Sequence, residues 1–379
     1  MKIGIEGQRL YRTKKHGMDM VALELIKQLQ KIDQINEYVI FVKPDEDHCI
    51  PDASNFKVIE LGGGPYPTWE QFALPRAAAA EGCDLLHCTS NTGPMYSKVP
   101  LITIVHDMIY MESNSLLKKG GTWYQKFGNM YRRLVVPKVI QKSTIVTTVS
   151  NYEKERMERF FHLDQKKLRA VYNGVGEHFQ PVTDQELLAK ARSKYNLPDH
   201  FVFFLGNTDP KKNTPNVLKA FAEFKAQSKV DYKLVMLDYD ETALQNVLNS
   251  IGHPETRSDI HLAGYVPNSD LPFIINQCEV FLYPSMRESF GIPILEGMAC
   301  GVPVLTSNTS SMPEIAGDAA YLVDPSKSEE ITAGILKIIN DQEYRASLCQ
   351  KGLDRAKLFS WKAMAEHYLK LYQEIYNQL

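Results

Sequence analysis

Two glutamates, Glu288 and Glu296, lie eight positions apart around a segment that contains an aromatic residue, a glycine and a proline. The apolar run 280–284 before them predicts a buried strand, and Gly301 with Pro303 after them predicts the end of a helix. We therefore expect Glu288 in a strand-to-helix loop and Glu296 early in the helix. Carboxylates in these places can accept hydrogen bonds from sugar hydroxyls. The simpler alternative is two solvated glutamates near a loop.

The segment between the two glutamates is also suited to bind phosphate. Phe290, Gly291 and Ile292 stand where the helix is expected to begin, and the free backbone N–H groups of a helix start attract phosphate. Because the N–H groups serve the phosphate, the carboxylates stay available for hydroxyls. The pattern indicates a ligand that carries both phosphate and sugar.

A second candidate phosphate site follows the strongly apolar strand predicted at 201–205. Gly206 and Asn207 form a turn there, and Lys211 and Lys212 stand at the start of the next helix. Lysine binds phosphate as a point charge. The alternative is a solvated lysine pair in a loop.

His106 and Asp107 end the strand predicted at 101–105. Residues at the carboxyl ends of strands in an open α/β sheet point into the ligand crevice. A histidine there can donate or accept a hydrogen bond near neutral pH. Taken alone, the pair is as readily structural as functional, and Asp107 could serve only to orient His106.

Length and composition are those of a globular protein with about two domains. The chain has 379 residues, 44% hydrophobic and 23% charged, and its net charge of −2 does not suggest a nucleic-acid partner. No apolar run is long enough to span a membrane, and the N-terminus reads as a first strand and not as a signal peptide. Six cysteines show no disulfide framework. We expect a cytoplasmic protein.

Strands and helices alternate along the whole chain, which is typical of the α/β class with parallel sheets. Two successive doubly wound units fit better than one very wide sheet. The expected boundary lies in a segment rich in glycine and proline, which gives a first domain at 1–178 and a second at 179–360. Residues 361–379 form a long amphipathic helix. The strands are predicted at 2–6, 38–42, 56–61, 85–88, 101–105, 144–149, 168–172, 201–205, 233–237, 260–263, 280–283 and 304–306.

A basic segment without any acidic residue runs from Ser113 through Tyr152. Its part at 118–142 interleaves lysines and arginines with aromatic residues, a composition that suits an anionic membrane surface or a lipid-diphosphate acceptor. A plain solvated helix face is the alternative. The basic residues are Lys118, Lys119, Lys126, Arg132, Arg133, Lys138 and Lys142.

The stretch 288–296, together with the fourteen residues after it, resembles the paired-glutamate signature of retaining nucleotide-sugar glycosyltransferases of the family-4 type. The resemblance runs from about Leu101 to Trp361. It implies a GT-B fold, in which two Rossmann-like domains face each other across a cleft and the C-terminal helix crosses back to the first domain. It also implies that the first domain binds the acceptor and the second binds the donor.

The resemblance assigns a role to each candidate residue of the second domain. Glu296 takes the ribose hydroxyls, Glu288 holds hydroxyls of the donor sugar, and Lys212 contacts the donor diphosphate. Lys211 replaces an adjacent arginine of the family. Asn207 departs from the pattern, because many members have an arginine after the glycine.

In the first domain, the resemblance places His106 against the donor sugar or the acceptor. Gly17 keeps the place of a glycine-rich turn that lets the backbone approach the substrate and the diphosphate, although this chain has only one glycine there. Neither a metal nor another cofactor is expected, since the near match Asp238–Tyr239–Asp240 is not in a convincing metal-binding loop.

The motif at 284–303 is similar to that of the mannosyltransferase branch of the family. The expected reaction therefore moves a hexose, most readily mannose from GDP-mannose, to a hydroxyl of a glycan or lipid-linked acceptor in polysaccharide biosynthesis. Contact with the inner membrane face would be peripheral. Three alternatives stay open: a UDP-sugar donor, a non-catalytic nucleotide-sugar-binding subunit, and a sugar-nucleotide isomerase on the same fold.

Overall fold

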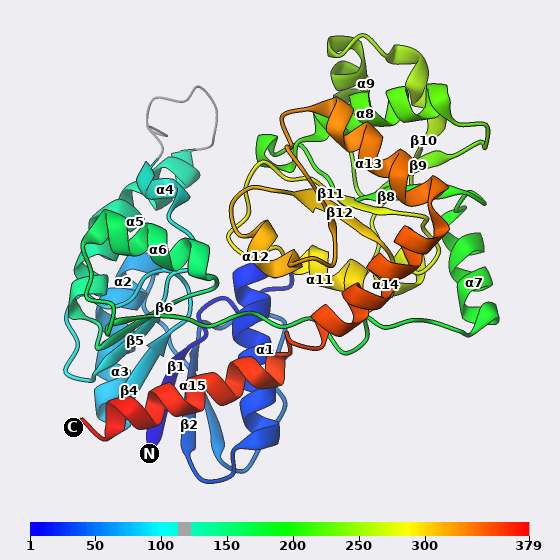
Figure 1. Cartoon of the computed structure of the whole chain (residues 1–379). Coiled ribbons are helices and arrows are strands. Elements are labelled where there is room, and N and C mark those ends of the chain that lie inside the picture. Colours follow the sequence, from blue (N-terminus) through cyan, green and yellow to red (C-terminus); the bar gives the residue numbers. More distant parts are fainter. Residues whose placement is uncertain (113–122, 379) are drawn as a thin grey trace. The chain divides into compact units, whose positions relative to one another are not determined.

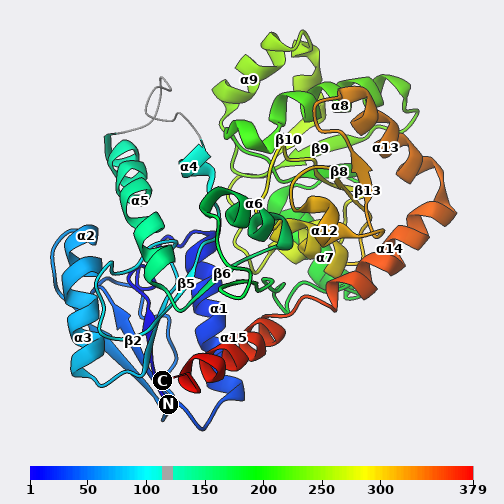
Figure 2. The same ribbon diagram turned by 60° about the vertical axis from the view of Figure 1, so that its left-hand side comes forward.

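The computed structural model describes residues 1–112 and 123–378, and its chain divides into two compact units (Figures 1 and 2). Unit 1 comprises Met1–Gly174 with Trp361–Leu379, and unit 2 comprises Val175–Ser360. Each unit has its own parallel sheet, as the sequence analysis predicted. The two units are described separately below.

Unit 1 contains a seven-stranded parallel sheet in the order β3-β2-β1-β4-β5-β6-β7. Its central strands are fully buried and mostly apolar, because helices cover both faces of a parallel sheet. The strands are β1 (Lys2–Glu6), β2 (Glu37–Val42), β3 (Phe56–Glu60), β4 (Leu85–Cys88), β5 (Leu101–Ile104), β6 (Ile145–Thr148) and β7 (Leu168–Ala170).

Helices cover both faces of this sheet (Figures 1 and 2). Successive residues of a strand therefore contact helices on opposite faces. Val146 of β6 packs in a buried cluster with α5, whereas the next residue, Thr147, hydrogen-bonds Tyr368 of α15 at 3.0 Å. The unit's helices are α1 (Gly17–Ile32), α2 (Tyr66–Thr68), the π-helical turn η1 (Trp69–Ala73), α3 (Leu74–Ala80), α4 (Ile109–Glu112), α5 (Trp123–Lys142), α6 (Asn151–Phe161) and α15 (Trp361–Tyr376).

The C-terminal helix α15 belongs to unit 1, which confirms the expected return of the chain to its first domain. Its apolar stripe is buried against α1 and β4. The hydroxyl of Tyr372 also lies 2.6 Å from Nδ1 of His87, a strand residue with no exposed surface. Burial lowers the pKa of His87 to about 3, so its imidazole is neutral and structural.

Unit 2 contains a six-stranded parallel sheet in the order β10-β9-β8-β11-β12-β13. Five of its strands were predicted from the sequence, and the edge strand β13 was missed. The strands are β8 (Phe201–Phe204), β9 (Lys233–Met236), β10 (Ile260–Leu262), β11 (Phe281–Tyr283), β12 (Val304–Ser307) and β13 (Tyr321–Val323).

One face of the unit 2 sheet packs on α8, α9 and α13, and the other packs on α11. At Gly297 of α11, an added Cβ would lie 2.4 Å from the ring of Phe281 and 2.8 Å from Val304, so only glycine allows this close contact with the sheet. The helices are α7 (Gln185–Tyr195), η2 (Pro210–Lys212), α8 (Thr214–Gln227), α9 (Glu241–Ser250), η3 (Pro254–Asp259), α10 (Leu271–Ile275), α11 (Ile292–Ala299), α12 (Met312–Ala316), α13 (Ser328–Asn340) and α14 (Gln342–Ala356).

Both sheets have a switch point, where the strand order reverses along the chain. It lies between β1 and β4 in unit 1 and between β8 and β11 in unit 2. Ligands of open α/β sheets bind at the carboxyl ends of the strands beside such a point. The candidate residues described next follow these four strands or the neighbouring β5.

Candidate active site

In unit 2, Lys212, Tyr283 and Glu288 form one hydrogen-bonded cluster at the switch point. The Lys212 ammonium donates to Glu288 Oε1 at 2.7 Å and to the Tyr283 hydroxyl at 2.6 Å, and the hydroxyl donates to Glu288 Oε1 at 2.9 Å. The side chains of Lys212 and Glu288 are only 15% and 13% exposed. A cation and a carboxylate are therefore held together in a place where charges are poorly solvated.

The cluster changes the properties of its aromatic member. Burial, followed by the charge of Glu288, raises the pKa of Tyr283 well above its usual range. The phenol therefore stays protonated and serves as a donor to Glu288. The Lys212 ammonium lies 4.6 Å from the centre of the Tyr283 ring, where the π face adds to its attraction.

Two serines hold the loop that carries Glu288. The backbone N–H of Glu288 donates to Ser310 Oγ at 3.0 Å. The Ser311 hydroxyl lies 2.9 Å from the Glu288 carbonyl and 3.0 Å from the Phe290 carbonyl, between which its one hydrogen is shared. Both serines follow β12, so the neighbouring strand end fixes the loop. Phe290 itself is buried, and its ring meets Phe359 edge-on at 6.0 Å.

Lys212 is positioned by a short 3₁₀ turn. Asp209 caps this turn by accepting from the Lys211 N–H at 3.0 Å, and Asn213 ends it in the left-handed region with φ of 63°. The Asn213 side chain donates to the carbonyls of Pro284 and Pro325 at 3.0 and 2.6 Å. These bonds tie the loop after β8 to the loops after β11 and β13.

The remaining predicted residues of this loop have different environments. The Lys211 side chain is 40% exposed and its ammonium lies 3.9 Å from Asp209, while its carbonyl accepts from the Met286 N–H at 2.7 Å. Asn207 is exposed and shapes the turn: its Oδ1 accepts from the Asp209 N–H at 2.9 Å, and its carbonyl accepts from Thr214 Oγ1 at 2.8 Å.

The start of α11 presents free backbone donors beside the Glu288 loop. Gly291 is its N-cap, with φ of 99°, a conformation that favours glycine. The N–H groups of Gly291 and Ile292 have no acceptor within the described part of the chain, whereas Ile294 N–H donates back to Gly291 at 3.0 Å. Pro293 lacks an N–H. Two donors are therefore available to an anion.

Glu296 lies on the same helix and is 9% exposed. Over residues 1–112 and 123–378 its carboxyl has no hydrogen-bond or ion-pair partner. Burial raises its pKa to about 7. A buried carboxyl without a partner is costly to the fold, and hydroxyl donors from a ligand would offset this cost.

In unit 1, His106 is buried at the carboxyl end of β5 and is fixed by two neighbours. Its Nε2 lies 2.9 Å from the Thr89 carbonyl, which can only accept, so Nε2 carries the hydrogen. Its backbone N–H donates to Asn91 Oδ1 at 2.5 Å. Burial lowers the pKa of His106, so the ring is neutral and Nδ1 can accept a hydrogen bond. Asp107 accepts from the Ile109 N–H at 3.2 Å and so supports the start of α4.

Sequence reasoning missed several buried polar residues near His106. Glu6 ends β1 with no exposed surface, and its carboxylate accepts from the Gln8 N–H at 2.9 Å and from Thr89 Oγ1 at 3.0 Å. Burial lowers the pKa of Arg9, but the charges of Tyr66, Glu6 and Asp19 outweigh it and leave that pKa raised. The sequence signal that could have revealed this group is an acidic residue at the end of the apolar first strand.

Gly17 opens α1 near the same edge. It is exposed, and an added Cβ would have no protein atom within 4 Å. Protein packing therefore does not require a glycine there, which leaves close approach of a ligand as its possible role. Asp19 accepts from the His16 N–H at 2.9 Å and caps the helix, and Lys15 hydrogen-bonds Asp47 and the Arg12 carbonyl.

The basic segment is described only in part. Lys118 and Lys119 lie outside the described residues. In α5, Arg133 Nε donates to the Tyr110 carbonyl at 2.7 Å, and the Arg132 guanidinium lies over the Tyr110 ring and donates to Asn129 Oδ1 at 3.2 Å. These two arginines thus contact their own unit.

Neither a metal cluster nor a membrane-spanning helix is found in the described part of the chain. No group of three or more His, Cys, Asp or Glu side chains there could hold a metal ion, and no described helix is both long and apolar enough to cross a bilayer. Asp240 of the near match instead caps α9 by accepting from the Ala243 N–H at 2.7 Å.

Two family models match the chain, one on each unit. Residues 16–178 match the model described as Glycosyltransferase Family 4, and residues 188–355 match Glycosyl transferases group 1. The matches include His106 in the first model and Lys212, Glu288 and Glu296 in the second. The chain belongs to the family-4 glycosyltransferases.

Two curated relatives of this family member are named as mannosyltransferases. The O-antigen chain mannosyltransferase B of Escherichia coli is 31% identical over 236 residues, which cover 62% of this chain and 61% of the relative. The serotype-specific mannosyltransferase WbdA of Escherichia coli is 25% identical over 58% of this chain, but that match covers only 28% of WbdA. In both cases the match spans less than two thirds of the relative.

Solved structures of low identity share the fold of this family-4 glycosyltransferase. Sucrose-phosphate synthase from Thermosynechococcus elongatus superposes with a TM-score of 0.76 at 18% identity and covers 100% of both chains. Anabaena HepE in complex with UDP-glucose gives a TM-score of 0.74 at 16% identity and covers 99% of this chain and 100% of its own. These likenesses establish the GT-B fold expected from the sequence.

Proposed function

We propose that the protein transfers a hexose from a nucleoside diphosphate sugar to a hydroxyl of a glycan or lipid-linked acceptor, with retention at the anomeric carbon. The observation that carries this proposal is the partly buried cluster of Lys212, Glu288 and Tyr283 beside the free helix start at Gly291. It offers cationic and N–H donors for a diphosphate next to acceptors for sugar hydroxyls.

Charge on the leaving diphosphate grows in the transition state, so donors aimed at it accelerate the reaction. Lys212 is the main donor, because its ammonium is held by two hydrogen bonds in a site that water reaches poorly. The N–H groups of Gly291 and Ile292 add dipolar stabilisation. Lys211 contributes at longer range, since its side chain is more exposed.

The sugar and the ribose are assigned to the two glutamates. Glu288 accepts from hydroxyls of the donor sugar, with its orientation fixed by Tyr283. Glu296 accepts from the ribose hydroxyls, which fits its buried carboxyl without a protein partner. Ribose hydroxyls would satisfy this carboxyl and favour its ionised form.

Unit 1 supplies the acceptor-side groups in this proposal. The neutral His106 ring presents Nδ1 as an acceptor for a substrate hydroxyl, because the Thr89 carbonyl occupies Nε2. Gly17 lets a substrate approach the start of α1, where no side chain blocks it. The proposed reaction uses no metal, because Lys212 and the helix start serve the diphosphate.

The proposed donor is GDP-mannose. The names of the two Escherichia coli relatives support mannose. The competing donor is a UDP-sugar, which is what the HepE complex contains. The base is expected to contact the loop after β10, where Gly264 has φ of 71° and Tyr265 is 76% exposed. A site built to hydrogen-bond one base disfavours another.

Calorimetric titration with GDP and UDP tests the base, and turnover of GDP-mannose and UDP-sugars with oligosaccharide or polyprenyl-linked acceptors tests the reaction. Tight UDP binding without GDP binding rejects the guanine assignment and keeps the transferase. Donor binding without turnover on any acceptor favours a non-catalytic binding subunit. An interconverted sugar nucleotide without acceptor indicates an isomerase. The anomeric configuration of the product, read by NMR, tests retention.

A further inference from the structure

Three basic side chains of unit 1 surround a pocket that the proposed reaction does not use. Arg76, Lys98 and Lys142 line a cavity of about 470 Å³ together with Phe72 and Tyr96. This volume lies within the range of ordinary ligand pockets. No acidic side chain lines it.

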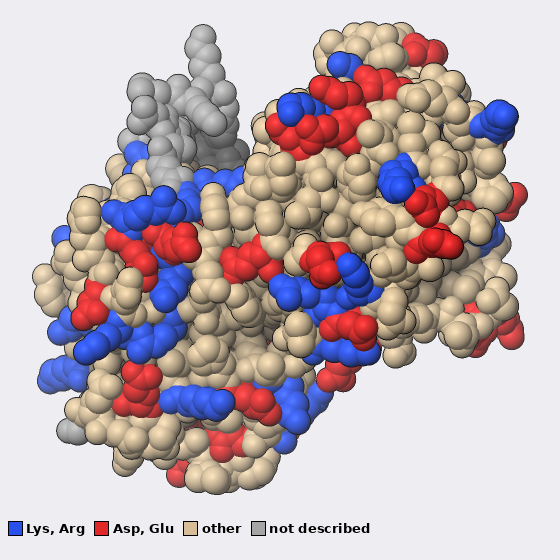
Figure 3. Space-filling view, in the orientation of Figure 1, with Lys and Arg blue, Asp and Glu red and all other residues tan. Residues whose placement is uncertain are grey.

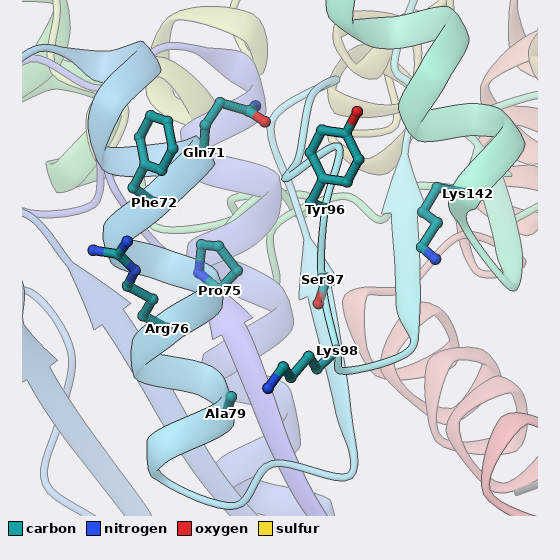
Figure 4. A pocket seen from close by; sticks show the side chains of 9 residues that line it. All are labelled: Gln71, Phe72, Pro75, Arg76, Ala79, Tyr96, Ser97, Lys98 and Lys142. Atoms are coloured by element: carbon teal, nitrogen blue, oxygen red, sulfur yellow. The ribbon is translucent and has the colours of Figure 1, made fainter.

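The walls of this pocket come from three parts of the chain that are far apart in sequence (Figure 4). Phe72 and Arg76 stand on η1 and α3 along one side, Tyr96 and Lys98 stand on the loop before β5 along the other, and Lys142 is the last residue of α5. Figure 3 shows Lys and Arg side chains over the α2, α3 and α5 side of unit 1, with acidic side chains among them.

Gln71 joins the three walls. Its Nε2 donates to the Gly93 carbonyl at 2.9 Å and to the Tyr131 hydroxyl of α5 at 2.8 Å, and its Oε1 accepts from the Met95 N–H at 2.9 Å. The same Nε2, which has two hydrogens to share among these acceptors, also lies 3.0 Å from Glu70 Oε2. A side chain with this many bonds across the walls makes the pocket pre-formed, which lowers the entropic cost of binding.

The three cations have no partner to neutralise them. Arg76, Lys98 and Lys142 are exposed, and each lacks an ion pair or a side-chain hydrogen bond within residues 1–112 and 123–378. Glu81, the acid at the end of α3, is already paired with Lys57 at 2.8 Å. An anion in the pocket would therefore meet cations that no protein carboxylate neutralises.

The aromatic residues at the rim favour a membrane surface over a small soluble anion. Phe72 is 57% exposed and Tyr96 is 84% exposed, both beside the cations. Aromatic rings next to basic residues are the combination that lies at the boundary between lipid headgroups and acyl chains. A soluble phosphate would have no use for exposed rings of this size.

The pocket is separate from the candidate active site. Lys98 comes just before β5, Lys142 comes just before β6, and α3 ends just before β4, so the pocket lies toward the amino ends of these strands. His106 follows the carboxyl end of β5. A ligand can therefore occupy the pocket without occupying the substrate edge of this unit.

We propose that this pocket binds the phosphate headgroup of an anionic phospholipid and docks the protein on an anionic membrane surface through Phe72 and Tyr96. The inference does not depend on the transferase reaction, because binding is measured without donor or acceptor. It places membrane contact at Arg76, Lys98 and Lys142 and leaves out Arg132 and Arg133, which contact their own unit.

The test is co-sedimentation of the full chain with vesicles of phosphatidylcholine, with and without phosphatidylglycerol, at low and high salt. We expect binding only to the mixed vesicles, and loss of binding at high salt. Because each basic residue near an anionic surface contributes about fivefold, the double variant Arg76→Gln/Lys98→Gln should bind about 30-fold more weakly. Its matched control, Lys190→Gln/Lys229→Gln, removes two exposed cations of unit 2 and should bind like the wild type.

A second variant separates insertion of the aromatic rings into the lipid from electrostatic adsorption of the protein on the vesicle surface. Phe72→Ser/Tyr96→Ser should weaken vesicle binding at every salt concentration while keeping the salt dependence. Each variant's melting temperature checks that it is folded. The proposal is overturned if the wild type ignores mixed vesicles at low salt, or if the Arg76/Lys98 variant binds like the control. Binding of glycerol phosphate without binding of vesicles also overturns it, in favour of a soluble ligand.

Discussion

The Lys212 ammonium lies 2.7 Å from Glu288 Oε1, so the main cation and one of the two glutamates of the candidate donor site form a partly buried ion pair. A diphosphate that arrives beside Lys212 must share this ammonium with Glu288. The two residues consequently act as one unit, and the effects of changing them should not add.

Glu288→Gln is expected to abolish most turnover and leave the protein folded. The amide keeps the shape of the side chain, so the serine-held loop should persist. Its one oxygen replaces Oε1 as the acceptor for Lys212 and Tyr283, and the NH2 group that replaces Oε2 cannot accept from a sugar hydroxyl. Initial rates with the donor, together with the circular dichroism spectrum, measure this. Wild-type turnover in a folded Glu288→Gln protein would show that the glutamate has no role in the reaction.

Lys212→Ala is expected to weaken donor binding and to slow the chemical step, with about 2–4 kcal/mol of lost transition-state stabilisation. The neighbouring Lys211→Ala is the matched control. It removes the same charge from a side chain that is 40% exposed, so its effect should be much smaller. Kd from calorimetry and single-turnover rates separate the two contributions. Equal effects at both positions contradict the geometry.

The double variant Lys212→Ala/Glu288→Gln tests the pair itself. Each single change leaves a partly buried partner unsatisfied. The two single-variant losses of transition-state stabilisation, calculated from kcat/KM, should therefore sum to more than the loss in the double variant, by about 1 kcal/mol or more. Additive losses would mean that the ion pair is absent in the working enzyme.

Donor affinity is expected to fall as the pH falls through 7, because burial raises the pKa of Glu296 to about 7. Above this pKa the carboxylate accepts from ribose hydroxyls, and below it the protonated group is a poorer acceptor. If only the ionised form binds, affinity at pH 6 is about tenfold weaker than at pH 8. The intact nucleotide sugar should be used as ligand, since its diphosphate does not titrate in this range.

Glu296→Gln is the control for this pH dependence. It should bind the donor more weakly at pH 8 and show little change between pH 6 and pH 8. If the donor affinity of the wild type does not change between pH 6 and pH 8, a group other than Glu296 binds the ribose.

Activity is expected to persist in excess EDTA, because the Lys212 ammonium and the start of α11 serve the diphosphate in the proposed reaction. The measurement is the initial rate after extensive chelation, compared with the rate after readdition of magnesium or manganese. Full loss of activity that either metal restores contradicts the prediction.

The sequence determined the secondary structure and the fold class, because these depend on local patterns. Apolar runs of four or five residues alternate with helical periods, and this is enough to place twelve strands within one or two residues and to indicate two doubly wound units. It also placed His106 at a strand end, Glu288 in a strand-to-helix loop and Lys212 at the start of the helix after a strand, all on the side where parallel sheets bind ligands.

Only the tertiary structure decided which of these residues contact each other. Lys212 and Glu288 are 76 positions apart, and their pairing depends on β8 and β11 being neighbours in the sheet. Tyr283 was hidden in an apolar strand, and its hydroxyl gains a role only when Lys212 lies beside it.

The same physical reason explains the basic pocket. Arg76 and Lys98 lie outside the charge run at 118–142, and no local pattern in the sequence links them to Lys142. They share a pocket because α3, the loop before β5 and the end of α5 meet on one side of the sheet. Local sequence sets which element each residue joins, whereas long-range packing of those elements sets which side chains form a site.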